Sequence, residues 1–312
     1  MTRHLRSDVD LNPQEYLRVL DLAQMLKRHP EHYRTKLNGR SIAVIFSKQS
    51  TRTRVSFEVG IYQMGGQPLI LTSSGSTGMQ MGRGESTSDT AKVMARYVDA
   101  IAIRTFGQNE VDDLAKYGGI PIINALTDMY HPCQALADTL TLRERFGDTH
   151  GLKLVYVGAG NNVAHSLMLA GPRAGYDVVV ACPKEVPPNP KVLKRAQDDA
   201  KKFKTHVRVE RDVHKAVKGA HAIYTDTWVS MGQDSEADEL RQKLQSYQVT
   251  AALMEEARPN AIFLHCLPAH RGEEVLDEVM DGRWSAVFDQ AENRLHVQKA
   301  LLLLLLGIES WS

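Results

Sequence analysis

The stretch "SIAVIFSKQSTRTRVSFEVG", residues 41–60, joins an apolar run to a segment with helical spacing. Residues 41–46 are almost wholly apolar, which is typical of a strand buried on both faces of a parallel sheet. Residues 50–54 are all hydroxyl or guanidinium side chains. The segment after them carries an apolar stripe at helical spacing, at Val55, Val59 and Tyr62. The stretch therefore predicts a strand, a polar turn and a helix, which is the repeating unit of a parallel α/β sheet.

The polar turn of this unit has the composition of an anion site. Residues 50–53 fall at the start of the predicted helix, where backbone N–H groups have no partner within the helix. The hydroxyls of Ser50, Thr51 and Thr53 and the guanidinium of Arg52 fall at the same end. Such a set suits a multiply charged oxyanion, above all phosphate. This stretch alone also fits a well-capped helix with solvated arginines. It lacks GxxxxGK[ST], so a P-loop kinase is not indicated.

The same alternation of apolar runs and helical segments continues along the chain. The first series of expected strands is 41–46, 68–71, 100–104 and 121–124, and the second is 153–158, 177–182, 206–210, 222–225, 261–266 and 286–288. Two series predict an α/β protein with two domains, each a parallel sheet covered by helices, and an active site in the cleft between them.

The expected domain limits follow from the two series. We expect a first domain at 1–135, a connecting helix at 136–149 and a second domain at 150–290. A C-terminal helix at about 292–312 is expected to pack back on the first domain. The Pro-rich segment 183–190 is expected to be a surface linker.

Composition limits the possible partners. The 312 residues are 43% apolar and 24% charged, and the net charge of +1 provides no field that would attract nucleic acid or anionic lipid. The N-terminus lacks the apolar core of a signal peptide, and the leucine run at 301–306 is too short to span a bilayer. Three cysteines form no disulfide framework. We therefore expect a cytoplasmic protein with no nucleic-acid or membrane partner.

Polar clusters follow seven of the expected strands, at the end where open parallel sheets bind ligands. Besides residues 47–54, these clusters are "RTF" at Arg104, "ALTDMYHPCQ", "AGNN", "DTWVSMG", "HCLPAHRGEE" and "DQAENR". In "HPCQ", His131 suits polarising an oxygen and Gln134 suits recognising an amide, although a structural histidine also fits. Asn161 and Asn162 suit an amino-acid backbone, or one of them simply caps a helix. Asp226 suits an ammonium group.

Other chemistries fit less well. The "GAGNNV" turn lacks the third glycine of a dinucleotide loop, where Val163 stands, and no acidic residue ends the next strand. His131 with Cys133, and His265 with Cys266, lack the spacing of a zinc site, and no CxxC is present. No cysteine-protease signature is present either. We therefore expect no metal and no cofactor.

Taken together, the motifs resemble the aspartate/ornithine carbamoyltransferase family in order along essentially the whole chain. "STRTR", "RTF" and "HPCQ" are similar to the family's carbamoyl phosphate elements, and "DTWVSMG" and "HCLPAHRGEE" match those of the ornithine branch. Two positions depart from the family pattern. Ala159 stands where an Asp is usual, and Ser47 stands in "FSK" where "FEK" is usual. Neither change removes a matched ligand.

The resemblance implies a reaction and the residues that perform it. The reaction is carbamoyl transfer from carbamoyl phosphate to the side-chain amine of L-ornithine, giving L-citrulline and phosphate. The implied carbamoyl phosphate ligands, in the 1–135 domain and beyond it, are Ser50, Thr51, Arg52, Thr53, Gln80, Arg104, His131, Gln134, Cys266, Leu267 and Arg294. The implied ornithine ligands, in the 150–290 domain, are Asn162, Asp226, Ser230 and Met231. The implied catalytic residues are Arg104, His131 and Cys266.

The resemblance also implies a homotrimer or a multiple of trimers, with Gln80 reaching a neighbouring subunit's site. Two alternatives stay open at this stage: a different amine acceptor such as putrescine, and a non-catalytic anion- or amino-acid-binding regulator. Retention of Arg104, His131 and Cys266 argues against the regulator. The sequence leaves open the anabolic or catabolic direction, the acceptor of the amine's proton, and whether Leu267-Pro268 is cis.

Overall fold

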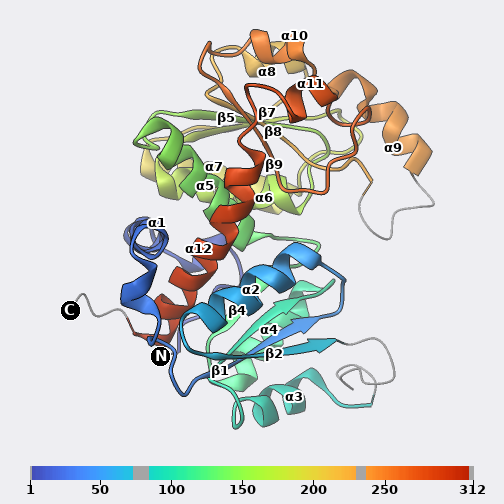
Figure 1. Ribbon diagram of the computed structural model, residues 1–312. Coiled ribbons are helices and arrows are strands. Elements are labelled where there is room, and N and C mark those ends of the chain that lie inside the picture. Colours follow the sequence, from blue (N-terminus) through green and yellow to red (C-terminus); the bar gives the residue numbers. More distant parts are fainter. Residues whose placement is uncertain (1, 73–83, 230–236, 309–312) are drawn as a thin grey trace. The chain divides into compact units, whose positions relative to one another are not determined.

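The computed structural model describes residues 2–72, 84–229 and 237–308 (Figure 1). The chain divides into two compact units. One consists of Met1–Leu140 with Asn293–Ser312, and the other is Thr141–Glu292. The chain passes between the units inside two helices, α5 at Pro132–Phe146 and α12 at Val287–Leu306. In the described part of the chain, no helix combines the length and apolar character needed to cross a membrane.

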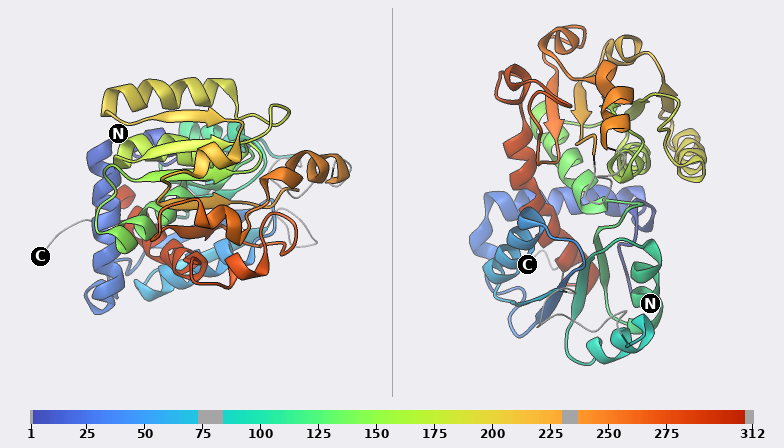
Figure 2. Two further views of the ribbon diagram at one scale, coloured as in Figure 1. Left: turned by 90° about the horizontal axis from the view of Figure 1, so that it is seen from above. Right: turned by 90° about the vertical axis from the view of Figure 1, so that its right-hand side faces the viewer.

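The first unit contains a four-stranded parallel sheet in the order β2-β1-β3-β4. Its strands are β1 Ser41–Phe46, β2 Gln67–Thr72, β3 Ala100–Arg104 and β4 Ile122–Leu126. Helix α2, Thr51–Gln63, covers one face, and α3, Thr87–Met94, and α4, Gln108–Gly118, cover the other (Figures 1 and 2). The order reverses between β1 and β3, which makes their carboxyl ends the switch point where open sheets bind ligands.

Two further helices complete this unit. Helix α1, Pro13–Arg28, begins with a cap in which the Asn12 side chain accepts from the backbone N–H of Glu15. The part of α12 that belongs to the unit packs on α2, because a Cβ added at Gly60 would lie 3.1 Å from Cγ of Lys299. Lys299 Nζ donates to Oε1 of Gln63 at 2.9 Å. Short 3-10 turns lie at Asp8–Asp10 and Pro30–Tyr33.

The second unit contains a five-stranded parallel sheet in the order β7-β6-β5-β8-β9. Its strands are β5 Lys153–Val157, β6 Asp177–Ala181, β7 Val207–Glu210, β8 Ala222–Thr225 and β9 Ile262–His265. Helices α6, Asn162–Ala174, and α7, Pro190–Phe203, cover one face. The other face carries α8 Val213–Val217, α10 Ala251–Glu255 and α11 Asp277–Met280. Helix α9, Ala237–Leu244, leads into a 3-10 turn at Gln245–Tyr247. The switch point here lies between β5 and β8.

One expectation about local structure was wrong. Residues 286–288 form no strand, since α12 begins at Val287 and only Ser285 makes an isolated bridge, to Phe263. The polar cluster "DQAENR" therefore lies on a helix. A short apolar run does not distinguish a strand from a buried helical turn by periodicity, and here the long helix that follows decides the structure.

The helix predicted from the apolar stripe at Val55, Val59 and Tyr62 is α2, and the stripe faces away from the unit's interior. Val55, Val59 and Tyr62 are 50%, 37% and 76% exposed, whereas Phe57 and Ile61 face the unit's interior. The segment 183–190, expected to be a surface linker, is an irregular loop up to the start of α7, and Lys184, Glu185 and Pro187 in it are exposed. The carbonyl of Val186 accepts from Gly160 N at 2.9 Å, so the loop also packs against the turn after β5.

Candidate active site

The start of α2 lies where the sequence places it, at the carboxyl end of β1. Ser50 is the N-cap: its Oγ accepts from Thr53 N at 3.3 Å and donates to Thr53 Oγ1 at 3.0 Å. No acidic residue occupies the first turn. The cap uses one hydroxyl only, and Thr51 and Arg52 are exposed at a helix end that carries partial positive charge. This end of α2 is therefore chemically suited to an anion.

Arg294, from α12, ties two other predicted ligands together. Its Nη1 donates to Gln134 Oε1 at 2.6 Å, and its Nη2 donates to Thr53 Oγ1 at 3.2 Å. Gln134 Nε2 donates in turn to Asp138 Oδ1 at 2.8 Å. All four side chains are buried. The two contacts of Gln134 fix which end of its amide is the acceptor, so the helices α2, α5 and α12 present polar groups in a defined orientation.

His131 is held as a neutral imidazole. It is 4% exposed and precedes the first residue of α5. Burial is the main cause that lowers its pKa well below the ordinary value, and the nearby charges of Arg294, Arg104 and Arg52 lower it further. The three guanidinium groups are therefore near enough to His131 to act on its charge. Arg104 is the last residue of β3, at the switch point of the sheet.

The loops after three strands are joined at the same edge of this sheet. Ser47 N donates to the Arg104 carbonyl at 2.8 Å, and Thr105 N donates to the Leu126 carbonyl at 2.9 Å. Lys48 pairs with Asp128, and its Nζ lies 4.2 Å from the centre of the Phe106 ring. These contacts fix the loops that carry the predicted anion ligands.

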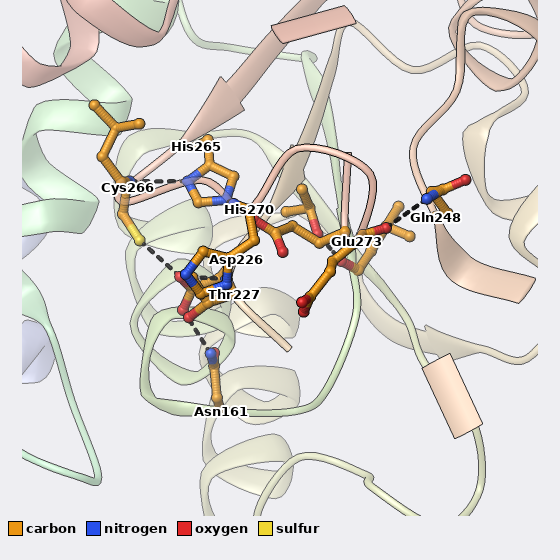
Figure 3. Close-up of polar contacts among 12 residues, drawn as sticks. Asn161, Asp226, Thr227, Gln248, His265, Cys266, His270 and Glu273 are labelled. Carbon is orange, nitrogen blue, oxygen red and sulfur yellow. Dashed lines mark hydrogen bonds and ion pairs between the residues drawn. The ribbon is translucent and has the colours of Figure 1, made fainter. Parts of the chain in front are cut away.

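A second polar cluster lies at the switch point of the other unit (Figure 3). Asp226, just after β8, accepts from the Cys266 thiol at 2.9 Å and from Thr227 N at 2.8 Å, both on Oδ1. Its Oδ2 accepts from Asn161 Nδ2 at 2.7 Å. The ends of β5, β8 and β9 thus supply an amide, a carboxylate and a thiol to one place. A carboxylate presented in this way suits a cationic amine.

Sequence reasoning missed Asn161 as the partner of Asp226. Asn161 is the N-cap of α6, whereas Asn162, the predicted ligand, is the first residue of that helix. The signal was present, because Asn is a preferred N-cap residue and the sequence left open which of the two capped the helix. The role of Asn162 as a ligand stays a prediction.

Sequence reasoning also missed Glu274, which orients His265. The imidazole Nδ1 accepts from Leu267 N at 2.8 Å, so the ring's proton lies on Nε2, 3.2 Å from Glu274 Oε1. Both side chains are fully buried. His265 therefore holds the backbone between Cys266 and Leu267, where Leu267 has a φ of +61° and the Leu267-Pro268 bond is cis.

Two groups of potential metal ligands occur among the described residues, Asp226, His265 and Cys266, and His270, Glu273 and Glu274. In the first group, both nitrogens of His265 have hydrogen-bond partners and the thiol donates to the carboxylate. It is therefore a hydrogen-bond network in this structure. Gln80, Ser230 and Met231 lie outside the described residues.

The class of protein follows from this arrangement. Each unit is an open parallel α/β sheet with a polar cluster at its switch point, one built of arginines, hydroxyls and a neutral imidazole, the other of an amide, a carboxylate and a thiol. Such a pair of clusters defines an α/β protein that binds small polar ligands.

Comparison with known proteins identifies the family. Residues 3–144 match the model "Aspartate/ornithine carbamoyltransferase, carbamoyl-P binding domain", and residues 150–305 match the model of the "Asp/Orn binding domain". The chain belongs to the aspartate/ornithine carbamoyltransferase family.

Relatives named ornithine carbamoyltransferase match over nearly the whole chain. That of Gloeobacter violaceus is 51% identical over 298 residues, covering 96% of this chain and 94% of the relative. That of Thermococcus kodakarensis is 51% identical over 301 residues, with the same coverage. A solved structure of the Pyrococcus furiosus enzyme has a TM-score of 0.94 at 49% identity, covering 98% of this chain and 97% of that one.

Proposed function

We propose that this chain transfers the carbamoyl group of carbamoyl phosphate to the side-chain amine of L-ornithine, giving L-citrulline and phosphate in arginine biosynthesis. The observation that carries the proposal is the buried Arg294 guanidinium, which donates both to Thr53 in the first turn of α2 and to Gln134 of α5. Relatives at about half identity support it, including one from Pyrococcus furiosus named "Ornithine carbamoyltransferase, anabolic".

The first unit supplies the carbamoyl phosphate site in this proposal. The phosphate binds at the N-terminus of α2, to the hydroxyls and N–H groups of residues 50–53 and to the Arg52 guanidinium. Arg104 and His131 contact the carbamoyl oxygen. The proposed ligands of the carbamoyl amide and the rest of the pocket are Gln134, Arg294 and the Leu267 backbone, with Cys266 beside the reacting amine.

The residue types match the charge that develops in the reaction. The amine attacks the carbonyl carbon, a C–N bond forms, and negative charge grows on the carbonyl oxygen. The C–O bond to phosphate then breaks, and the phosphate leaves with the electron pair. A neutral His131 N–H, the Arg104 guanidinium and the Thr53 hydroxyl stabilise the oxygen, each such donor being worth about 2.7–4 kcal/mol. Arg52 and the helix N-terminus stabilise the departing phosphate.

The second unit supplies the amino-acid site. We assign ornithine to Asn162, Asp226, Ser230 and Met231, with the Asp226–Cys266 pair nearest to the amine. An amine of this kind has a reference pKa near 10.4, so it arrives protonated and must lose a proton before it attacks. The Asp226 carboxylate and the leaving phosphate are the two acceptors that the site offers. Direct transfer requires the bound amine to reach the carbonyl carbon of carbamoyl phosphate.

A homo-oligomer, a trimer or a multiple of trimers, is part of the proposal. Its support is the exposed stripe of Val55, Val59 and Tyr62, which runs along the helix whose first turn forms the anion site. An exposed apolar stripe of this kind marks an association surface. Gln80 would reach a neighbouring subunit's site. We also propose that the protein acts in the cytoplasm.

A comparison of acceptors tests the proposed function. Purified protein with carbamoyl phosphate is offered ornithine, putrescine, aspartate or N-acetylornithine, and the carbamoylated product is measured. We expect product from ornithine, with the other three at least tenfold slower. Equal rates with putrescine would contradict the assignment of an acceptor bearing a free α-amino and α-carboxylate group, and no product from any amine would favour a non-catalytic binding protein.

A further inference from the structure

Tyr156 lies beneath the Asn161–Asp226–Cys266 network and contacts it directly. The residue is the fourth of five in β5 and is 1% exposed. Its hydroxyl donates to Asn161 Oδ1 at 3.1 Å. The ring packs against Tyr224 of the neighbouring strand β8, with 5.9 Å between ring centres. Tyr156 therefore connects the middle of the sheet to the polar cluster at its switch point.

The hydroxyl is one of three donors that meet at a single oxygen. Asn161 Oδ1 also accepts from Val163 N at 3.0 Å and from Ala164 N at 3.1 Å, the two contacts that cap α6. A side-chain amide has one acceptor end and one donor end. With its oxygen facing three donors, the amide turns its NH₂ toward Asp226 Oδ2, 2.7 Å away. A rotation by 180° would place an NH₂ against all three donors.

The hydroxyl keeps its proton under working conditions. Burial is the main cause that raises the pKa of Tyr156 well above its ordinary value, and the nearby Asp226, Cys266 and Cys182 raise it further. Because Asn161 presents its amide oxygen, the protonated hydroxyl donates to it. The two hydrogen bonds therefore run in one direction: the tyrosine hydroxyl donates to the amide oxygen, and the amide NH₂ donates to the carboxylate.

We propose that Tyr156 is a positioning residue for the amino-acid substrate, because its hydroxyl holds the Asn161 amide that orients the Asp226 carboxylate. It touches no substrate itself. The two backbone bonds of the cap survive without it, so α6 stays formed. Without the Tyr156 hydroxyl, the Asp226 carboxylate is held less firmly and binds the amino acid less well. Binding of carbamoyl phosphate should change little, because the proposed ligands of its phosphate group and carbamoyl oxygen lie in the other unit. The inference rests on the proposed function for the identity of that amino acid.

The first experiment compares Tyr156→Phe with Tyr247→Phe. The control removes another tyrosine hydroxyl of the same unit, which donates to the Arg211 carbonyl at 2.5 Å and touches none of the network. For Tyr156→Phe we expect the KM for ornithine to rise about three- to tenfold, the effect of one net hydrogen bond. The KM for carbamoyl phosphate should stay within about twofold, and so should both constants of the control.

A double-mutant cycle tests whether the effect passes through Asn161. Asn161→Gly removes the amide at the cost of only a few tenths of a kcal/mol of helix capping. Adding Tyr156→Phe to Asn161→Gly should then raise the KM for ornithine no further. The proposal is wrong if the two effects multiply, if the control shifts the KM equally, or if Tyr156→Phe fails to fold by circular dichroism.

The proposed function can fail separately from this inference. If the unchanged protein makes no citrulline, the function is wrong. The Tyr156 inference is then tested by calorimetric titration of ornithine into the same variants, where a three- to tenfold weaker binding supports it and equal binding contradicts it.

Discussion

The thiol of Cys266 lies 2.9 Å from Oδ1 of Asp226 and donates a hydrogen bond to it. In this contact the sulfur carries the proton and the carboxylate accepts. A thiolate would instead repel the carboxylate. The protonated thiol of Cys266 therefore orients the Asp226 carboxylate. The carboxylate is left with one oxygen directed at Asn161 and with lone pairs available to an incoming amine.

Substitution of Cys266 separates orientation from proton transfer. Serine keeps a donor for Asp226, whereas alanine removes it. We expect Cys266→Ala to lower kcat/KM for ornithine about tenfold or more, as loss of a hydrogen bond to a charged group does. Cys266→Ser should retain most of the activity. Steady-state kinetics decide the matter: a serine variant as poor as the alanine variant would show that the sulfur itself moves the proton.

The lowered pKa of His131 predicts a pH dependence of stability. Its ordinary pKa is near 6.5, and the folded-state pKa lies well below that. Between the folded-state pKa and about pH 6.5, the unfolded chain therefore binds more protons than the folded chain. The stability that comes from keeping His131 neutral is fully present above about pH 6.5, and it is lost as the pH falls toward the folded-state pKa.

The measurement is thermal unfolding between pH 7.5 and about pH 5, a window that spans the ordinary histidine pKa. His131→Gln should lose less stability across it than the unchanged protein, because the variant has no imidazole to protonate. His32→Gln, which removes an exposed imidazole, should follow the unchanged protein. Parallel curves for His131→Gln and the unchanged protein would contradict the assignment of a neutral, buried His131.

Arg294 should be irreplaceable by lysine. Its guanidinium donates to Gln134 and to Thr53 from two separate nitrogens. The single ammonium group of a lysine side chain does not reproduce this planar pair of donors. Arg294→Lys should raise the KM for carbamoyl phosphate about tenfold. As a control, Arg145→Lys alters an ion pair with Asp289 in which both side chains are about half exposed, and should change little. Equal effects of the two substitutions would remove Arg294 from the proposed site.

Acidic substitutions in the exposed apolar stripe of α2 should dissociate the proposed oligomer. Val59→Asp with Tyr62→Asp places two like charges on the apolar face. Sedimentation velocity should show a shift from the oligomer to the monomer. Tyr97→Asp, at a side chain that is 72% exposed outside the stripe, should leave the oligomer intact. An unchanged oligomer in the double variant would show that the stripe is not the association surface.

Sharing of sites between subunits predicts complementation. Gln80→Ala and Arg52→Ala should each lose most activity, since each removes a proposed contact to carbamoyl phosphate. Refolding the two together should recover part of it, because some sites in mixed oligomers then have both residues intact. No recovery, with mixed oligomers demonstrated by differential tagging, would mean that Gln80 serves its own subunit.

The parts of the fold that sequence reasoning predicted best are the strands with a continuous apolar pattern. Runs such as 41–46 and 222–225 are strands with the expected bounds because a strand buried on both faces must be apolar throughout. Arg54 Nε lies 3.4 Å from Glu58 Oε2, a contact that the i,i+4 spacing on a helix favours. Residues 286–288 could not be assigned in this way, because three apolar residues fit either a strand or a helical turn.

The parts that sequence reasoning missed depend on the fold and on contacts distant in sequence. The apolar stripe at Val55 has the right period for a helix, but the period alone does not say whether the stripe faces the interior or another subunit. Asn161 and Asp226 are 65 residues apart, and only the adjacency of β5 and β8 brings them together. Glu274 lies in a polar run whose burial is visible only once β9 is placed.

The most direct test of the central claim is the stoichiometry of the reaction. Protein, carbamoyl phosphate and L-ornithine are incubated, and citrulline and phosphate are measured in the same samples over time, with protein-free and ornithine-free samples as blanks. The account predicts equal molar amounts of the two products and the loss of both in His131→Ala. Phosphate release without citrulline would contradict it.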